Sequence, residues 1–338
     1  MVRLGRTEFL VDVDTCSVPE ADVYNKVKIR GSFMNCKKEQ FPITRHFSRR
    51  QFFSMAMAGM GVLSPRFVFA NKESSGALRL GFMVWRIGDI LDFDKQVEWV
   101  AQAGFESISF HSSSGVAGKW QGVEPATADA KERQRLRQLL SRFAGYEIHA
   151  PFDAVVRPET TGLVLERLEE VIGFAGDVGA SIVTVHVEAP RKEASDMSWQ
   201  KALDKLDAVA AKADVRVGLE FNSGFEWLRK PSRERIGTTL DIGHMYHHEG
   251  LGYRPYGSIG GLVKFLDKTL FHLHVHDYDG KNDHLEIGTG RIDFDDMLKN
   301  LNAIGYRGTL CFELNPDRCP PEGVRRSAAF LRKRAAMI

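Results

Sequence analysis

From residue 78 onwards the sequence alternates short apolar runs with longer stretches whose apolar residues recur at helical spacing. This alternation predicts strands joined by helices. The strands are predicted at residues 78–85, 107–111, 147–152, 181–187, 216–221, 238–243, 270–276 and 308–313. Eight strands alternating with helices over roughly 250 residues are typical of a closed (β/α)8 TIM barrel. We therefore predict a single α/β domain over residues 71–338, with a shortened fifth helix because residues 225–235 leave little room.

An open, doubly wound sheet is the main structural alternative, since it also alternates strands with helices. Such sheets commonly carry a Gly-rich phosphate-binding loop directly after the first strand. The sequence after residues 78–85 has no such loop. The closed barrel is therefore the favoured architecture.

The predicted seventh strand carries three histidines on one face. Residues 270–276 alternate with period two, so His272, His274 and His276 point the same way. Imidazole is the commonest metal ligand among neutral side chains, although a single histidine on a strand is more often a satisfied core residue. Three on one face, followed by Asp277 and His284, favour a metal site.

The C-terminal ends of the other predicted strands carry similar residue types. Catalysis in such barrels takes place at these ends. The residues found there are His111, His149, His186, Glu220, Asp241, His244, His274 and Glu313. Carboxylates are rarely buried without a partner, and three that converge would repel one another unless a cation lay between them. The strand ends therefore predict a divalent metal site.

Three motifs at these ends resemble those of the xylose-isomerase-like barrel superfamily, which includes sugar epimerases, inosose dehydratases and apurinic endonucleases. They are LDIGH at 240–244, HVHD at 274–277 with DH at 283–284 and GTG at 288–290, and FELNP at 312–316. The resemblance covers residues 78–335. It implies that one divalent ion of manganese, zinc, magnesium or cobalt is bound by Glu220, Asp241, His274 and Glu313. It also implies that His244 contacts the substrate or a further metal.

Two positions depart from the patterns of the superfamily. Many of its sugar isomerases carry Glu where this chain has Ser109, so that substrate contact is not carried over. Its endonucleases, which bind three metals, carry Asp where this chain has Asn282. His149 and His186 nevertheless stand at the positions where the endonucleases carry histidines that bind their first metal. The resemblance therefore implies contacts to substrate or to a second metal for His149, His186, His244, His276 and His284.

The leading functional hypothesis is a divalent-metal-dependent sugar isomerase or epimerase that works through an enediolate intermediate. Glu220 and Glu313, on opposite sides of the metal, would exchange protons with the substrate carbon, and His244 is the next candidate base. A sugar lyase or dehydratase shares the first step and is the runner-up. A phosphodiesterase that cleaves abasic DNA and a non-catalytic sugar-binding barrel are weaker alternatives. Aromatic residues near the strand ends, including Phe152, either pack in the core or line a sugar pocket.

Residues 48–70 resemble a twin-arginine export signal. Arg49 and Arg50 precede a mildly apolar run, which ends in Val-Phe-Ala at 68–70. The run is too short and too Gly-rich to span a bilayer as a stable helix. Residues 1–47 are then an extension that results from a start codon assigned too early, with Met34 as one candidate start. We expect the mature chain to begin near Asn71 and to be periplasmic or otherwise exported.

The charge of the chain changes when residues 1–70 are removed. They hold 11 of the 46 Lys and Arg and 6 of the 44 Asp and Glu, which leaves 35 basic and 38 acidic residues and a net charge of −3. A basic surface for nucleic acid is therefore not expected. The expected partner is a small sugar or sugar derivative, with no nucleic acid and no stable membrane association after export. A homo-oligomer is a candidate assembly.

Overall fold

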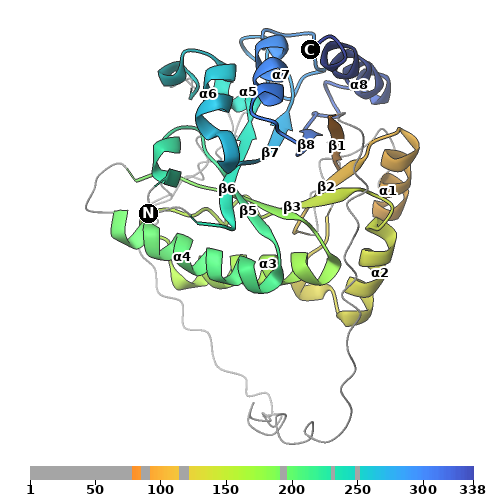
Figure 1. Cartoon of the computed structure of the whole chain (residues 1–338). Coiled ribbons are helices and arrows are strands. Elements are labelled where there is room, and N and C mark those ends of the chain that lie inside the picture. Colours follow the sequence, from red (N-terminus) through yellow and green to blue (C-terminus); the bar gives the residue numbers. More distant parts are fainter. Residues whose placement is uncertain (1–77, 85–91, 114–121, 191–195, 230–232, 248–251) are drawn as a thin grey trace, which may run out of the picture. The chain divides into compact units, whose positions relative to one another are not determined.

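The computed structural model describes residues 78–84, 92–113, 122–190, 196–229, 233–247 and 252–338. Within these residues eight parallel strands close into a barrel in chain order, and β8 pairs with β1 (Figure 1). The strands are β1 (Arg79–Met83), β2 (Ser107–His111), β3 (Gly145–His149), β4 (Ile182–His186), β5 (Arg216–Glu220), β6 (Ile236–Asp241), β7 (Leu270–Val275) and β8 (Thr309–Phe312). The predicted (β/α)8 barrel is confirmed. The predicted export signal and the extension before it lie outside the described residues.

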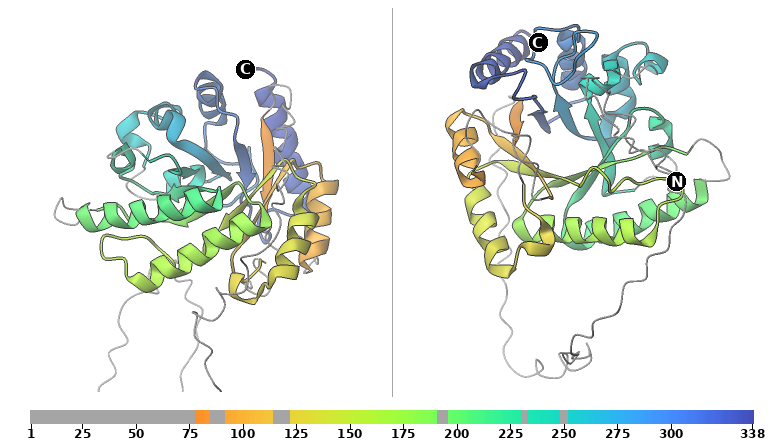
Figure 2. Two further views of the ribbon diagram at one scale, coloured as in Figure 1. Left: turned by 60° about the horizontal axis from the view of Figure 1, so that its bottom comes forward. Right: turned by 180° about the vertical axis from the view of Figure 1, so that it is seen from behind.

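Helices cover the outside of the barrel, and α3 and α4 pack side by side (Figure 2). The outer helices are α1 (Phe93–Gln102), α2 (Ala130–Leu140), α3 (Gly162–Val178), α4 (Asp196–Ala213), α6 (Ile259–Leu266), α7 (Phe294–Ala303) and α8 (Pro321–Ala335). Between β5 and β6 the helix is reduced to the 3-10 segment Phe225–Arg229, as the sequence predicts. Further 3-10 segments lie at Pro125–Thr127, Arg254–Tyr256 and Asp267–Thr269. Among the described residues, none of the helices is both long and apolar enough to cross a membrane.

The core lies between the sheet and the helices around it. Val183 and Val185 of β4 belong to the same buried cluster as Val171 and Phe174 of α3. Strands that are buried on both faces read as continuous apolar runs, which is the pattern seen in the sequence. The helix ends follow local rules: α1, for example, begins after Asp92, whose carboxylate accepts the backbone N–H of Lys95 at 3.0 Å.

Two strands, β3 and β6, lie earlier in the chain than predicted, and the other strands match the predicted ranges to within one or two residues at each end. β3 spans Gly145–His149 instead of the predicted 147–152, and it ends earlier because Pro151 has no N–H for the ladder. β6 ends at Asp241, since a short helix that was not predicted, α5 (Ile242–His247), starts directly after it. Both corrections leave the predicted functional side chains at strand ends.

Candidate metal centre and active site

Inward-facing side chains at the C-terminal ends of the strands form a ring at one mouth of the barrel. The register of the sheet places neighbours at the same level, for example Asp241 beside His274. The ring consists of His111, His149, His186, Glu220, Asp241, His274 and Glu313. The side chain of His186 is 28% exposed, and the other members of the ring are buried. Such a ring concentrates charge where barrels of this type bind their ligands.

The four residues predicted to hold a metal converge within this ring. His274 Nδ1 lies 3.1 Å from Glu313 Oε2 and 3.5 Å from Glu220 Oε2. Ligand atoms of Glu220, Asp241 and His274 all lie within 4.8 Å of one another. Four different strands contribute these side chains, so the closed barrel is what brings them together.

Three atoms of this set are buried without a hydrogen-bond partner among the described residues. They are Glu220 Oε2, Asp241 Oδ2 and His274 Nδ1. A buried polar atom that lacks a partner costs about 1–3 kcal/mol, and buried carboxylates are normally paired or bound to metals. Carboxylate oxygens and an imidazole nitrogen suit manganese, magnesium, zinc or cobalt. The donor set therefore fits a divalent ion.

The pKa shifts of residues in and beside this set also indicate a site for a cation. Burial alone would raise the pKa of Glu220, but His186 and the other histidines around it hold that pKa well below its usual range. Burial would lower the pKa of His244, yet attraction to Asp241 and Glu220 raises it to about 10. The carboxylates are therefore ionised at neutral pH, and protonated histidines balance their charge in the absence of a metal. A divalent cation can take over that balance.

The Asp-x-x-His spacing of the LDIGH motif follows from the start of α5. Asp241 caps this helix, and its Oδ1 accepts the backbone N–H of His244 at 2.8 Å. The first turn brings His244 Nδ1 to 3.3 Å from Asp241 Oδ2 and 3.4 Å from Glu220 Oε1. A Cβ at Gly243 would lie 1.8 Å from Cε1 of His276, which explains the glycine in the motif.

Two further histidines approach Glu220 from β3 and β4. His149 Nε2 and His186 Nε2 lie 3.6 and 3.5 Å from Glu220 Oε2. The Nδ1 of His149 lies 2.7 Å from the Ala150 carbonyl oxygen, which can only accept, so Nδ1 carries a proton and Nε2 faces Glu220. The ring of Phe152 is 38% exposed and lies 5.2 Å from the His149 ring and 5.5 Å from the His186 ring. An aromatic face therefore borders the carboxylates.

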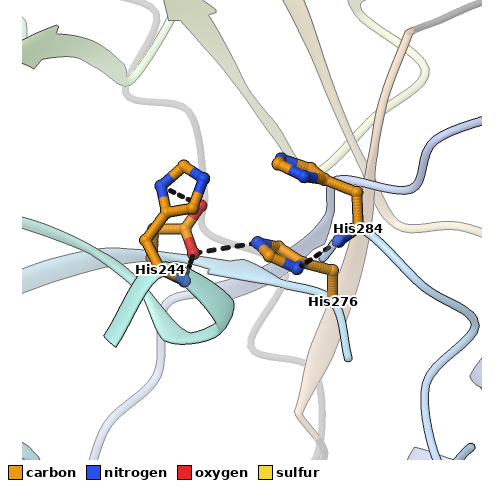
Figure 3. Close-up of side chains that lie close together, drawn as sticks. His244, His276 and His284 are labelled. Atoms are coloured by element: carbon orange, nitrogen blue, oxygen red, sulfur yellow. Dashed lines mark hydrogen bonds and ion pairs between the residues drawn. The ribbon is translucent and has the colours of Figure 1, made fainter. Parts of the chain in front are cut away.

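His244, His276 and His284 lie together beside Asp241 (Figure 3). His276 Nε2 is 2.9 Å from Asp241 Oδ1. His284 comes from the loop between β7 and α7, has a φ of 51°, and places Nε2 3.8 Å from Glu313 Oε1. Each histidine predicted to contact substrate or a second metal thus lies next to one of the carboxylates predicted to bind the metal.

Asp277 is a buried carboxylate whose role the sequence pattern did not indicate. It follows β7 and accepts the backbone N–H groups of Tyr278, Gly288, Gly290 and Ile292, at 2.8 to 3.3 Å. A Cβ at Gly290 would lie 2.3 Å from Asp277 Oδ1, which explains the second glycine of the GTG motif. Asp277 thereby folds the loop that carries His284 into the site.

Glu147 is a second such carboxylate, and it lies inside the barrel on β3. Its side chain shares the inward direction of His149, two residues later, and is 1% exposed. Ser109 Oγ donates to it at 2.6 Å. Ser109 is therefore buried beneath the ring and is not a substrate contact. The period-two parity of the strand was the one sequence signal that could have identified Glu147.

The fold and the ring together define a (β/α)8 barrel protein with a candidate metal centre at the C-terminal ends of its strands. The model of the xylose isomerase-like TIM barrel family matches residues 97–334, and the chain belongs to this family. The resemblance inferred from the motifs is thereby confirmed at the level of the family.

Several known proteins are similar to this chain in sequence or in structure. An uncharacterised protein of Methanocaldococcus jannaschii is 26% identical over 266 residues, which cover 65% of this chain and 86% of the relative. The L-ribulose 3-epimerase of Mesorhizobium japonicum is 22% identical over 257 residues, 68% of this chain and 78% of the relative. A crystal structure of a D-tagatose 3-epimerase-like protein matches with a TM-score of 0.58 at 21% identity, over 77% of this chain and 98% of its own. At this identity the match establishes the fold.

Proposed function

We propose that this protein is a sugar isomerase or epimerase that depends on a divalent metal ion. One observation carries the proposal. Glu220 Oε2 and Glu313 Oε2 approach His274 Nδ1 from different strands, at 3.5 and 3.1 Å. His274 Nδ1, Glu220 Oε2 and Asp241 Oδ2 are buried, and none of the three makes a hydrogen bond of good geometry within the described residues. An ion held by Glu220, Asp241, His274 and Glu313 would polarise the carbonyl group of a bound keto-sugar.

The two glutamates supply the proton transfers in this proposal. Epimerisation next to a carbonyl removes a proton from one face of a carbon and returns one to the other face. Burial would raise the pKa of both glutamates, but nearby histidines hold each below its usual range, so both are ionised at neutral pH, which is the state that a base requires. Because Glu220 ends β5 and Glu313 follows β8, they can serve opposite faces of one substrate.

A keto-sugar is the substrate class that we propose. One relative is named L-ribulose 3-epimerase, and one structural neighbour is described as D-tagatose 3-epimerase-like. The exposed ring of Phe152 beside His149 and His186 offers an aromatic face against which the C–H groups of a sugar can pack. Free ketoses are therefore the first substrates to test.

The decisive experiment is turnover of L-ribulose and D-tagatose by the purified, metal-loaded protein in heavy water. We expect formation of the 3-epimers, with deuterium at the epimerised carbon detected by NMR. Loss of water or of another leaving group from the sugar would instead identify a lyase or dehydratase. Cleavage of a DNA duplex at an abasic site would identify an endonuclease, and saturable sugar binding without turnover would identify a binding protein.

A further inference from the structure

The layer of side chains directly below the candidate metal centre is polar. The interior of such barrels is usually filled by Val, Ile and Leu. Here the layer contains buried polar residues on five strands, namely Ser109, Glu147, Thr184, Thr239 and His272. Burial of a carboxylate is costly unless hydrogen bonds and opposite charges compensate it. The position of Glu147 in this layer therefore needs a physical reason.

Glu147 is surrounded by donors from β2, β4 and β7. Its Oε2 accepts from Ser109 Oγ at 2.6 Å, its Oε1 accepts from the hydroxyl group of Thr184, and His274 Nε2 lies 2.9 Å from Oε1. His272 Nε2 forms an ion pair with Oε2 at 2.7 Å. Both oxygens of Glu147 thus accept hydrogen bonds from hydroxyl groups, as a carboxylate does.

The contact with Glu147 determines which nitrogen of His274 carries a proton. A carboxylate can only accept hydrogen bonds, so His274 Nε2 must be protonated to donate to it. Nδ1 of the same ring faces Glu220 and Glu313, at 3.5 and 3.1 Å. A histidine that donates to a carboxylate with one nitrogen is a better oriented and more basic metal ligand through the other.

We propose that Glu147 is a positioning residue of the metal centre, which orients His274 and selects Nδ1 as the atom that binds the divalent ion. His272 contacts the same carboxylate from below, with Nε2 2.7 Å from Oε2. The inference rests on the metal centre of the proposed function, and it adds a residue that does not itself touch the ion or the substrate.

The first test compares two variants of the same buried network. Glu147→Gln keeps the shape of the side chain but removes its charge and replaces one acceptor oxygen by an NH₂ group. Ser109→Ala is the matched control, because it removes one hydrogen bond to Glu147 without touching His274. Isothermal titration with Mn²⁺ after removal of bound metal should give about 10–100-fold weaker binding for Glu147→Gln. Ser109→Ala should bind like the wild type. A folded Glu147→Gln protein, as judged by circular dichroism, with wild-type Mn²⁺ affinity would overturn the proposal.

The second test uses the wild-type protein and so decides the question even where Glu147→Gln fails to fold. In Zn²⁺-loaded protein with ¹⁵N-labelled histidine, NMR should show the His274 ring bound to metal at Nδ1 and protonated at Nε2. Binding through Nε2, or a proton on Nδ1, would contradict the proposal. A wild-type protein that binds neither Mn²⁺ nor Zn²⁺ would refute the metal centre itself. If the wild type binds metal and Glu147→Gln binds it equally well, only the role of Glu147 is refuted.

Discussion

The rings of His276 and His284 stack face to face, with centroids 4.0 Å apart and planes inclined by 7°. The backbone N–H of His284 also donates to Nδ1 of His276 at 2.8 Å. His276 therefore carries its proton on Nε2, which donates to Asp241 Oδ1 at 2.9 Å. Both ring nitrogens of His276 are therefore engaged in this arrangement. Oδ2 of Asp241 is left to face the candidate metal centre.

The donor set leads us to expect about one tightly held divalent ion per chain. His274→Ala and Asp241→Ala each remove a ligand, so both variants should lose most of the metal that the wild type retains after desalting. His247→Ala is the control, because that ring is 42% exposed and pairs with Asp283. Plasma mass spectrometry of the purified proteins measures the ratio of metal to protein.

Two other outcomes of this measurement would change the assignment. Wild-type metal content in both His274→Ala and Asp241→Ala would place the metal elsewhere. Two or three ions per wild-type chain would bring His149, His186 and His284 into the ligand set, and would favour the phosphodiesterase alternative.

The pKa of His244, raised to about 10 in the metal-free fold, predicts a stability that depends on pH. A histidine in the unfolded chain has a pKa of about 6.5. Because the folded-state pKa is higher, the proton on His244 stabilises the fold fully below ~6.5, and this contribution is lost as the pH rises towards 10. The metal-free protein should therefore melt at a temperature lower by roughly 5 °C or more at the alkaline end of this range.

Calorimetric melting curves of the metal-free and metal-loaded proteins test this prediction. The melting temperature should depend less on pH in the metal-loaded protein, because the ion replaces the protonated histidines as the source of positive charge. This dependence should also be weaker in metal-free His244→Gln. An equal dependence on pH in the wild type and in His244→Gln would show that another group is responsible.

The barrel itself could be predicted because its strands are buried on both faces and its helices on one. These two burial patterns leave different apolar periodicities in the sequence. Once the barrel was predicted, the ring of polar side chains could be predicted too, because parallel strands in a barrel end at the same mouth. The short helix α5 could not be predicted, because the six residues Ile242–His247 contain a glycine and are too few to show a helical period.

The roles of the two carboxylates Glu147 and Asp277 could not be predicted, for a different reason. Glu147 gains its partners from β2, β4 and β7, so its role depends on the register between strands that are distant in the sequence. Asp277 binds backbone N–H groups, which leave no trace in the identity of the residues that supply them except for the two glycines at 288 and 290. Sequence periodicity reports burial, whereas these roles require three-dimensional contacts.

Asp277→Asn should destabilise the loop between β7 and α7. The substitution turns one acceptor oxygen of a buried side chain into an NH₂ donor that faces backbone N–H groups. Either Gly288 and Gly290, which share Oδ2, or Tyr278 and Ile292, which share Oδ1, therefore lose their acceptor. Each lost bond of this kind costs about 1–3 kcal/mol. Asp279→Asn is the matched control, since Asp279 also accepts backbone N–H groups in the same loop but is exposed.

Hydrogen exchange and thermal melting distinguish these two loop variants. Asp277→Asn should lower the melting temperature and speed the exchange of one pair of amides, either Gly288 with Gly290 or Tyr278 with Ile292. Asp279→Asn should leave the melting temperature and the exchange close to the wild type. Unchanged protection of all four amides in Asp277→Asn would mean that the loop is held by other contacts.

The proposed export signal is tested in cells, because residues 48–70 lie outside the described structure. Lysine keeps the charge of arginine but not its planar guanidinium group. Arg49→Lys combined with Arg50→Lys should therefore retain the protein in the cytoplasm, while Arg45→Lys, outside the pair, should not. Cell fractionation locates the protein, and the exported form should begin near Asn71. Export of the double variant would argue against the twin-arginine route.

The final prediction concerns the two glutamates, Glu220 and Glu313. Replacing either by Gln keeps the size of the side chain but removes a base, and loss of such a group typically lowers turnover by about 10²–10⁴-fold. A planar intermediate can be protonated from either face, so each face needs its own group. One of the variants should therefore still exchange deuterium into the substrate on its intact face while it forms no epimer.

NMR follows the exchange, and chromatography follows the product. Metal occupancy is matched to the wild type, because both side chains also belong to the ligand set. A fully loaded Gln variant with normal turnover would show that its glutamate is not the base, and His244, 3.4 Å from Glu220 Oε1, would be the next residue to replace.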